Sequence, residues 1–147
     1  MTPPQVPKTS RNSSHIVLNR QRKLAIDTRR VRKFLSDLSL HREKHSVTCS
    51  VVFINDEAMR EYNRKYRGLD KPTDVLSFRG DEDYLGDILI SAETAFDQAR
   101  KSSSLTFETS ICRLVLHGFL HLTGYDHETD NGEMRAIERR LRRKFQC

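Results

Sequence analysis

The chain is organised around one stretch, His117-Gly118-Phe119-Leu120-His121-Leu122-Thr123-Gly124-Tyr125-Asp126-His127. The first two histidines are four residues apart, so on a helix they lie on one face, one turn from each other. Gly124 follows three residues later and can adopt the left-handed conformation that ends a helix and turns the chain back. That turn would return His127 towards the other two. Three neutral imidazoles with a fourth position open to water are typical of a catalytic zinc site.

The spacing of these histidines fits more than one class of metal-dependent enzyme. Cys112 lies five residues before His117 and off its helical face, so the ligands would all be nitrogen atoms, which suits zinc, nickel or copper. Metzincin proteases share this His spacing. They also need a glutamate directly after the first histidine as general base, and here that position is Gly118. The sequence therefore disfavours a peptidase.

The composition indicates one domain with a basic surface. With 147 residues the chain can build a single core, and we interpret residues 1–14, which contain three prolines, as a disordered tail before one domain over 15–147. The 26 basic and 20 acidic residues give a net charge of +6, which favours a polyanionic partner. No apolar run approaches membrane-spanning length, and the N-terminus lacks the apolar core of a secretory signal. Three scattered cysteines indicate reduced thiols in a cytoplasmic protein.

The periodicity of apolar residues predicts alternating strands and helices. Strands are expected over 15–19, 47–54 and 85–91, with 47–54 central because it is apolar on both faces. Helices are expected over 26–40, from Asn55 or Asp56 to Gly68, from Ser91 to about 102, through the histidine motif, and from about 130 to the end. His15, at the start of the first strand, is expected at the surface or the sheet edge. The pattern predicts an α+β domain with a small mixed sheet packed by helices.

Two segments resemble the YbeY family of bacterial rRNA maturation factors, described as single-strand-specific endoribonucleases. The motif 117–127 is similar to the family signature H-G-x-L-H-L-x-G-Y-D-H at each specified position. The segment 63–78 is similar to N-x-x-Y-R-x-x-D-x-P-T-D/N-V-L-S-F-P, and Leu-Gly-Asp-Ile at 85–88 also matches. The family's last proline is replaced by Arg79, which either changes how this strand leaves the sheet or adds a charge near the groove.

The resemblance covers roughly residues 16 to 145 and implies a fold, a cofactor and a function. The fold is a small mixed four-stranded sheet packed by about five helices, with a central buried helix that carries the metal. One Zn²⁺ per chain would be held by His117, His121 and His127. The implied function is a zinc-dependent, single-strand-specific endoribonuclease in 16S rRNA 3′-end maturation and ribosome quality control. Single-stranded RNA and the ribosomal small subunit or its proteins would be the partners.

The resemblance also assigns roles around the metal. The resemblance maps the family's functionally important arginine onto Arg67. A guanidinium can bind phosphate oxygens in a bidentate way, which suits such a role. The alternative is an arginine that complements the dipole at the end of its helix. We expect His117, His121 and Arg67 to act in catalysis, and Lys65 and Ser77 to contact substrate beside Arg67.

Two carboxylates are candidates for orienting a ligand imidazole. Asp87 either does so or is an exposed carboxylate at a strand end. Asp126 either does so or shapes the turn.

The sequence leaves the nucleophile, the exact function and the oligomeric state open. The nucleophile is either a water activated by the metal or the 2′-hydroxyl of the RNA, and no residue of the motif is an obvious general base. A metal-dependent hydrolase of another bond is one alternative function. The other is a ribosome-assembly factor that binds RNA, with zinc holding the fold together. The sequence does not indicate the oligomeric state.

Overall fold

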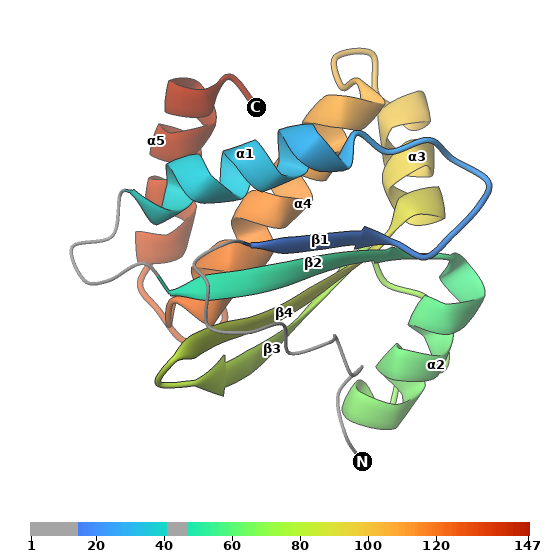
Figure 1. Ribbon diagram of the computed structural model, residues 1–147, viewed down its shortest axis with the longest axis horizontal. Coiled ribbons are helices and arrows are strands. Elements are labelled where there is room, and N and C mark those ends of the chain that lie inside the picture. Colours follow the sequence, from blue (N-terminus) through green and yellow to red (C-terminus); the bar gives the residue numbers. More distant parts are fainter. Residues whose placement is uncertain (1–14, 41–46) are drawn as a thin grey trace.

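The computed structural model describes residues 15–40 and 47–147 (Figure 1). The tail expected over 1–14 lies outside the described residues. The strands are β1 (Ile16–Asn19), β2 (Thr48–Ile54), β3 (Val75–Asp81) and β4 (Tyr84–Ser91). The helices are α1 (Thr28–Ser39), α2 (Asp56–Arg67), α3 (Ala92–Lys101), α4 (Phe107–Leu122) and α5 (Glu133–Phe145).

The strands form one mixed sheet in the order β1-β2-β4-β3. β1, β2 and β4 run parallel, and β3 pairs with β4 in the antiparallel direction. β2 is central, and its residues from Cys49 to Ile54 are all buried, as its two apolar faces predict. The expected α+β class with a small mixed four-stranded sheet and five helices is confirmed in the described part of the chain.

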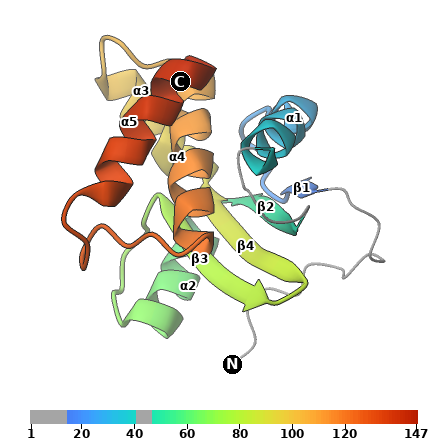
Figure 2. The ribbon, with the colours of Figure 1, turned by 90° about the vertical axis from the view of Figure 1, so that its left-hand side faces the viewer.

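Helices cover both faces of this sheet unequally. Val51 and Phe53 of β2 point into the larger core, which they share with α1, α4 and α5. Val52 and Ile54 alternate to the other face and pack with Met59 of α2. Figure 2 shows α4 between the sheet and α5, with α2 on the opposite side. The histidine motif therefore lies on the face of the sheet that α1, α4 and α5 cover, and Arg67 lies on the face that α2 covers.

Side-chain caps start the helices where the sequence places them. The Asn55 side chain accepts a hydrogen bond from the Ala58 N–H and begins α2, and Ser91 accepts one from Thr94 and begins α3. Gly68 ends α2 in the left-handed conformation. These three expectations are confirmed.

One sequence expectation is wrong and another holds only in part, because of how α1 and α5 pack. Cys112 and Cys147 form a disulfide, with 6.0 Å between their Cα atoms, so the expectation that all thiols are reduced does not hold. The two cysteines are 35 residues apart in sequence, and α5 folds back along α4 to bring them together. His15 directly precedes β1, a strand at the edge of the sheet, as expected. It is buried rather than at the surface, because its ring contacts Ser39 at the end of α1 and the backbone N–H of Cys49 in β2.

Two further expectations concern a membrane-spanning segment and the effect of Arg79 on its strand. No helix among the described residues is long and apolar enough to cross a bilayer. Arg79 neither stops nor diverts β3, since the strand continues to Asp81 with the exposed Arg79 opposite Gly86 of β4.

Candidate metal centre

The last turns of α4 place two imidazoles side by side. The Nε2 atoms of His117 and His121 are 3.1 Å apart, and the ring centroids are 4.7 Å apart. Two nitrogens bound to one zinc at about 2.0–2.1 Å in tetrahedral geometry would be about 3.3 Å apart. The spacing between these atoms thus fits two ligands of a single ion.

A tight turn after α4 brings in the third imidazole. The N–H groups of Gly124 and Tyr125 donate to the carbonyls of His121 and Leu120, each at 3.1 Å. Gly124 has a φ of +107°, which a residue with a side chain rarely adopts. The turn places the His127 ring centroid 5.4 Å from both other rings, and one donor atom from each histidine lies within 4.8 Å of the others. The ligand cluster expected from the sequence is therefore assembled.

Burial and charge favour the neutral form of His121. His117 and His121 are half-buried, whereas His127 is exposed and leaves one side of the cluster open to solvent. Burial lowers the pKa of His121, and the charges of His117 and His127 lower it further. A neutral imidazole has the lone pair that a metal needs. Three nitrogen donors with one open side fit a zinc ion that keeps a position for water or substrate.

Glu138, which is not among the site residues expected from the sequence, supports this cluster from α5. Its Oε1 accepts a hydrogen bond from His117 Nδ1 at 2.8 Å, and its Oε2 accepts one from Arg142 at 3.1 Å. Burial acts to raise the pKa of Glu138, but the bond from His117 and the positive charges of His117 and Arg142 outweigh it, and the pKa is lowered. An ionised carboxylate at Nδ1 leaves Nε2 free to bind metal and holds the ring in place.

A sequence signal for Glu138 did exist. The residue lies on the apolar stripe of α5, between Met134 and Leu141, and is buried with them. A charged residue at a core-facing position needs a partner inside the protein. Only the fold shows that this partner is a metal-ligand histidine.

The helix that carries His117 and His121, α4, packs closely on the sheet at Gly118. A methyl group at Gly118 would come within 2.7 Å of Ile88 Cγ2, so glycine allows the helix to sit directly on β4. Ser77 of β3 donates a hydrogen bond to the Gly118 carbonyl at 3.2 Å. Ser77, expected to bind substrate, thus ties α4 to the sheet next to His117. The same crowding leaves no room for the glutamate that a metzincin needs at position 118.

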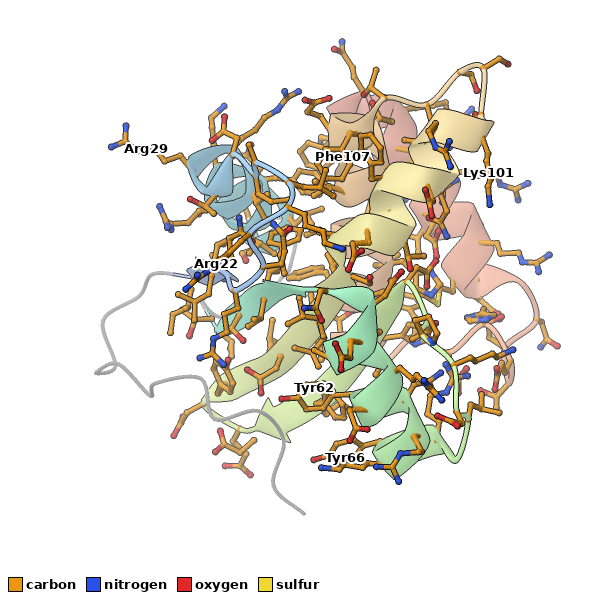
Figure 3. The ribbon with its side chains drawn as sticks, turned by 90° about the vertical axis from the view of Figure 1, so that its right-hand side faces the viewer. Arg22, Arg29, Tyr62, Tyr66, Lys101 and Phe107 are labelled. Carbon is orange, nitrogen blue, oxygen red and sulfur yellow. A yellow bond between two sulfur atoms is a disulfide. The ribbon has the colours of Figure 1, made fainter. Side chains whose placement is uncertain are left out.

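Arg67 and Lys65 lie apart from this packed region. Both are exposed in the last turn of α2, and the Arg67 side chain makes no hydrogen bond or ion pair with another described residue. Tyr62 and Tyr66, on the same helix, stack with ring centroids 6.3 Å apart, and Figure 3 shows both on this surface. No interaction between described residues links Arg67 to the histidines, so its role at the metal stays a prediction.

The two carboxylates considered for orienting the imidazoles are occupied elsewhere. Asp87 is buried in β4 and accepts hydrogen bonds from Ser50 at 2.5 Å and Tyr84 at 2.6 Å. Asp126 accepts the backbone N–H of Glu128 at 3.0 Å and so shapes the turn before the last helix. Among the described residues, the carboxylate that touches a ligand imidazole is that of Glu138.

Comparison with known proteins gives relatives that cover most of this chain. The sequence matches the family described as Endoribonuclease YbeY over residues 16–146. It is 39% identical to Endoribonuclease YbeY of Geobacter sulfurreducens, covering 88% of this chain and 91% of that one. It is 36% identical to Endoribonuclease YbeY of Thermodesulfovibrio yellowstonii, covering 88% and 92%.

A solved structure gives the same fold. The solution structure of TM1509 from Thermotoga maritima superposes with a TM-score of 0.63 at 29% identity, covering 85% of this chain and 84% of that one. The family match spans both segments that resemble the family signature, the histidine motif and the stretch that contains Arg67. The chain belongs to the Endoribonuclease YbeY family, which supports a role as a nuclease that cuts RNA.

Proposed function

We propose that this protein is a zinc-dependent endoribonuclease that cuts single-stranded RNA and acts in the 3′-end maturation of 16S rRNA and in ribosome quality control, in the cytoplasm. The observation that carries the proposal is the cluster of His117, His121 and His127, with donor atoms within 4.8 Å of one another and an open side. A zinc ion held there supplies a Lewis acid that polarises water or a phosphoryl oxygen.

The residues around the cluster have distinct tasks in this proposal. Glu138 holds His117 in the tautomer that presents Nε2. Both Glu138 oxygens are already engaged, by His117 and Arg142, so this carboxylate is not placed to act as a general base. The exposed Arg67 guanidinium is free to grip the scissile phosphate once RNA is bound. The attacking group is then a water activated at the metal or the 2′-hydroxyl of the substrate.

An open site favours an enzyme over a structural zinc. Structural zinc sites are usually closed by four protein ligands. The cluster in the described residues has three, and the third, His127, is exposed. The competing function, an assembly factor that binds RNA and uses zinc to hold its fold together, predicts RNA binding without cleavage.

Cleavage of a 3′-extended small-subunit rRNA fragment tests the proposal. Four preparations are compared: native protein, chelated protein, chelated protein restored with zinc, and His121→Ala purified in parallel. We expect cleavage by the native and zinc-restored proteins, and none by the other two. Cleavage by His121→Ala at the native rate would assign the activity to a contaminant. RNA binding by all four without any cleavage would favour the assembly factor.

A further inference from the structure

A pocket of about 260 Å³ opens beside the metal cluster and has no role in the site described so far. His117 forms one end of it, and Arg113 lies one helical turn before His117 on the same face of α4. Arg142 of α5 lines the pocket as well, and Asp74, just before β3, Gln98 of α3 and Ser110 of α4 contribute the remaining polar groups. The pocket therefore extends from the metal ligands towards the N-terminus of α4, between α3 and α5.

Two guanidinium groups, those of Arg113 and Arg142, line this pocket. Arg113 Nε donates to the backbone oxygen of Cys147 at 3.1 Å, and Arg113 makes no ion pair with a described carboxylate. Arg142 pairs with Glu138, but its Nε is buried without a hydrogen-bond partner among the described atoms. Burial, and then the charge of Arg142, lower the pKa of Arg113, as expected for a cation held near a like charge. The arrangement provides donors and positive potential for an anionic group.

The rest of the pocket differs from a simple anion site. Val75, Leu105 and Leu114 supply apolar surface. Asp74 accepts a hydrogen bond from Gln98 at 3.1 Å, so a carboxylate and an amide lie together at the wall. A bare phosphate gains nothing from apolar surface and is repelled by a carboxylate. A nucleotide fits both parts, because its base has apolar faces and polar edges while its phosphate needs cations.

We propose that this pocket binds one nucleotide of the RNA strand next to the scissile phosphate, with its phosphate between Arg113 and Arg142 and its base against Val75 and Leu114. The inference rests on the proposed function, because it names where that substrate lies. His117 belongs to both the pocket and the metal cluster, so a strand held here is led directly to the metal. Arg113 thus acts in substrate binding, and the pocket sets the direction in which the strand crosses the site.

Equilibrium binding tests this without requiring cleavage. Metal-loaded wild type, Arg113→Gln, Arg113→Lys and Arg139→Gln are titrated against a short 2′-O-methyl single-stranded RNA at increasing salt, with fluorescence anisotropy as the readout. Arg139 is an exposed arginine of α5 outside the pocket, so Arg139→Gln is a control with the same change in charge. We expect Arg113→Gln to weaken binding about tenfold and to reduce the slope of log K against log[salt] by about 0.7, the loss of one phosphate contact.

The control variants separate the pocket from general electrostatics. Arg139→Gln should change affinity less than about twofold, and Arg113→Lys should restore the salt slope because it restores the charge. Equal effects of Arg113→Gln and Arg139→Gln, in proteins with matching thermal melts, would overturn the proposal. So would a wild-type protein that does not bind the RNA.

Cleavage kinetics with ordinary RNA then separate the two proposals. If both hold, Arg113→Gln raises KM about tenfold and leaves kcat within about twofold. Binding that depends on Arg113 without cleavage by any preparation would support the pocket and refute the endoribonuclease. Cleavage with a KM unchanged by Arg113→Gln would refute the pocket and leave the endoribonuclease standing.

Discussion

The two regions that matched the family most closely, the histidine motif and the Arg67 segment, are built in opposite ways. His117 and His121 sit on a helix pressed onto the sheet at Gly118 and backed by Glu138 from α5. Arg67 is an exposed residue in the last turn of α2, on the other face of the sheet, with no described partner for its side chain. Metal ligands need fixed geometry, whereas in the proposed function Arg67 meets its phosphate only when RNA binds and needs no partner within the protein beforehand. Close packing is therefore found around the histidine cluster and not around Arg67.

The largest test of this comparison is Arg67→Ala. If Arg67 stabilises charge on the phosphate in the transition state, kcat should fall by about 10²–10³, as for loss of one donor to a developing charge, while RNA affinity changes far less. Single-turnover cleavage and anisotropy measure the two quantities. Arg64→Ala is the control, because Arg64 is also exposed in the last turn of α2 and its ion pair within the described part of the chain is with Glu61. Equal losses of turnover and affinity would contradict a transition-state role.

Glu138→Gln tests the closely packed region around the histidine cluster. Replacing the carboxylate removes the negative charge at His117 Nδ1 with little change in volume, and metal affinity should fall about 10–100-fold. Competition with a chromogenic chelator measures this affinity. Glu133→Gln, in the exposed first turn of the same helix, should leave it unchanged. A metal affinity unaffected by Glu138→Gln would show that His117 is oriented by α4 alone.

Two glycine substitutions compare the regions directly. Gly118→Ala places a methyl group 2.7 Å from Ile88 and should destabilise the protein by about 1–3 kcal/mol while shifting α4 and weakening metal binding. Gly68→Ala meets no atom within 4 Å, and its left-handed φ of +70° should cost about 1–2 kcal/mol without affecting the metal. Thermal melts and chelator competition provide both readouts. Comparable losses of metal affinity in the two variants would remove the distinction between the regions.

The smallest expected difference is in acid sensitivity. In metal-free protein the pKa of His121 is lowered by burial and by its neighbouring histidines, so on acidification the unfolded chain binds this proton before the folded chain does. Stability should therefore fall as pH drops below about 6.5. On the α2 side, the bidentate hydrogen bond from Arg60 lowers the pKa of Asp70, so that contribution is lost only at more acidic pH.

Chemical denaturation across the pH range tests this order. His121→Asn should flatten the stability curve between about pH 7 and 5. Asp70→Asn should lower stability by a constant amount above about pH 5, and should change the slope of the curve only below that pH. Stability of the metal-free protein that rises on acidification from pH 7 to 5 would contradict the assignment.

The sequence by itself determined the elements and the ligand set. Apolar periodicity predicted the five helices and the strands β1, β2 and β4, whereas a fourth strand was implied only by the family resemblance. The caps at Asn55, Ser91 and Gly68 marked helix ends, and the spacing of three histidines around Gly124 predicted the histidine cluster. These signals are local: each depends on residues within one or two turns, so the chain carries them whatever its tertiary structure.

Tertiary structure alone decided which distant residues meet. Glu138 is 21 residues from His117, and Cys147 is 35 residues from Cys112; both pairs form because α5 returns along α4. The same packing buried His15, placed Asp87 away from the metal, and joined Arg113 and Arg142 in one pocket. Local propensity does not encode such pairs, because they arise from the way whole helices bury their apolar faces against the sheet.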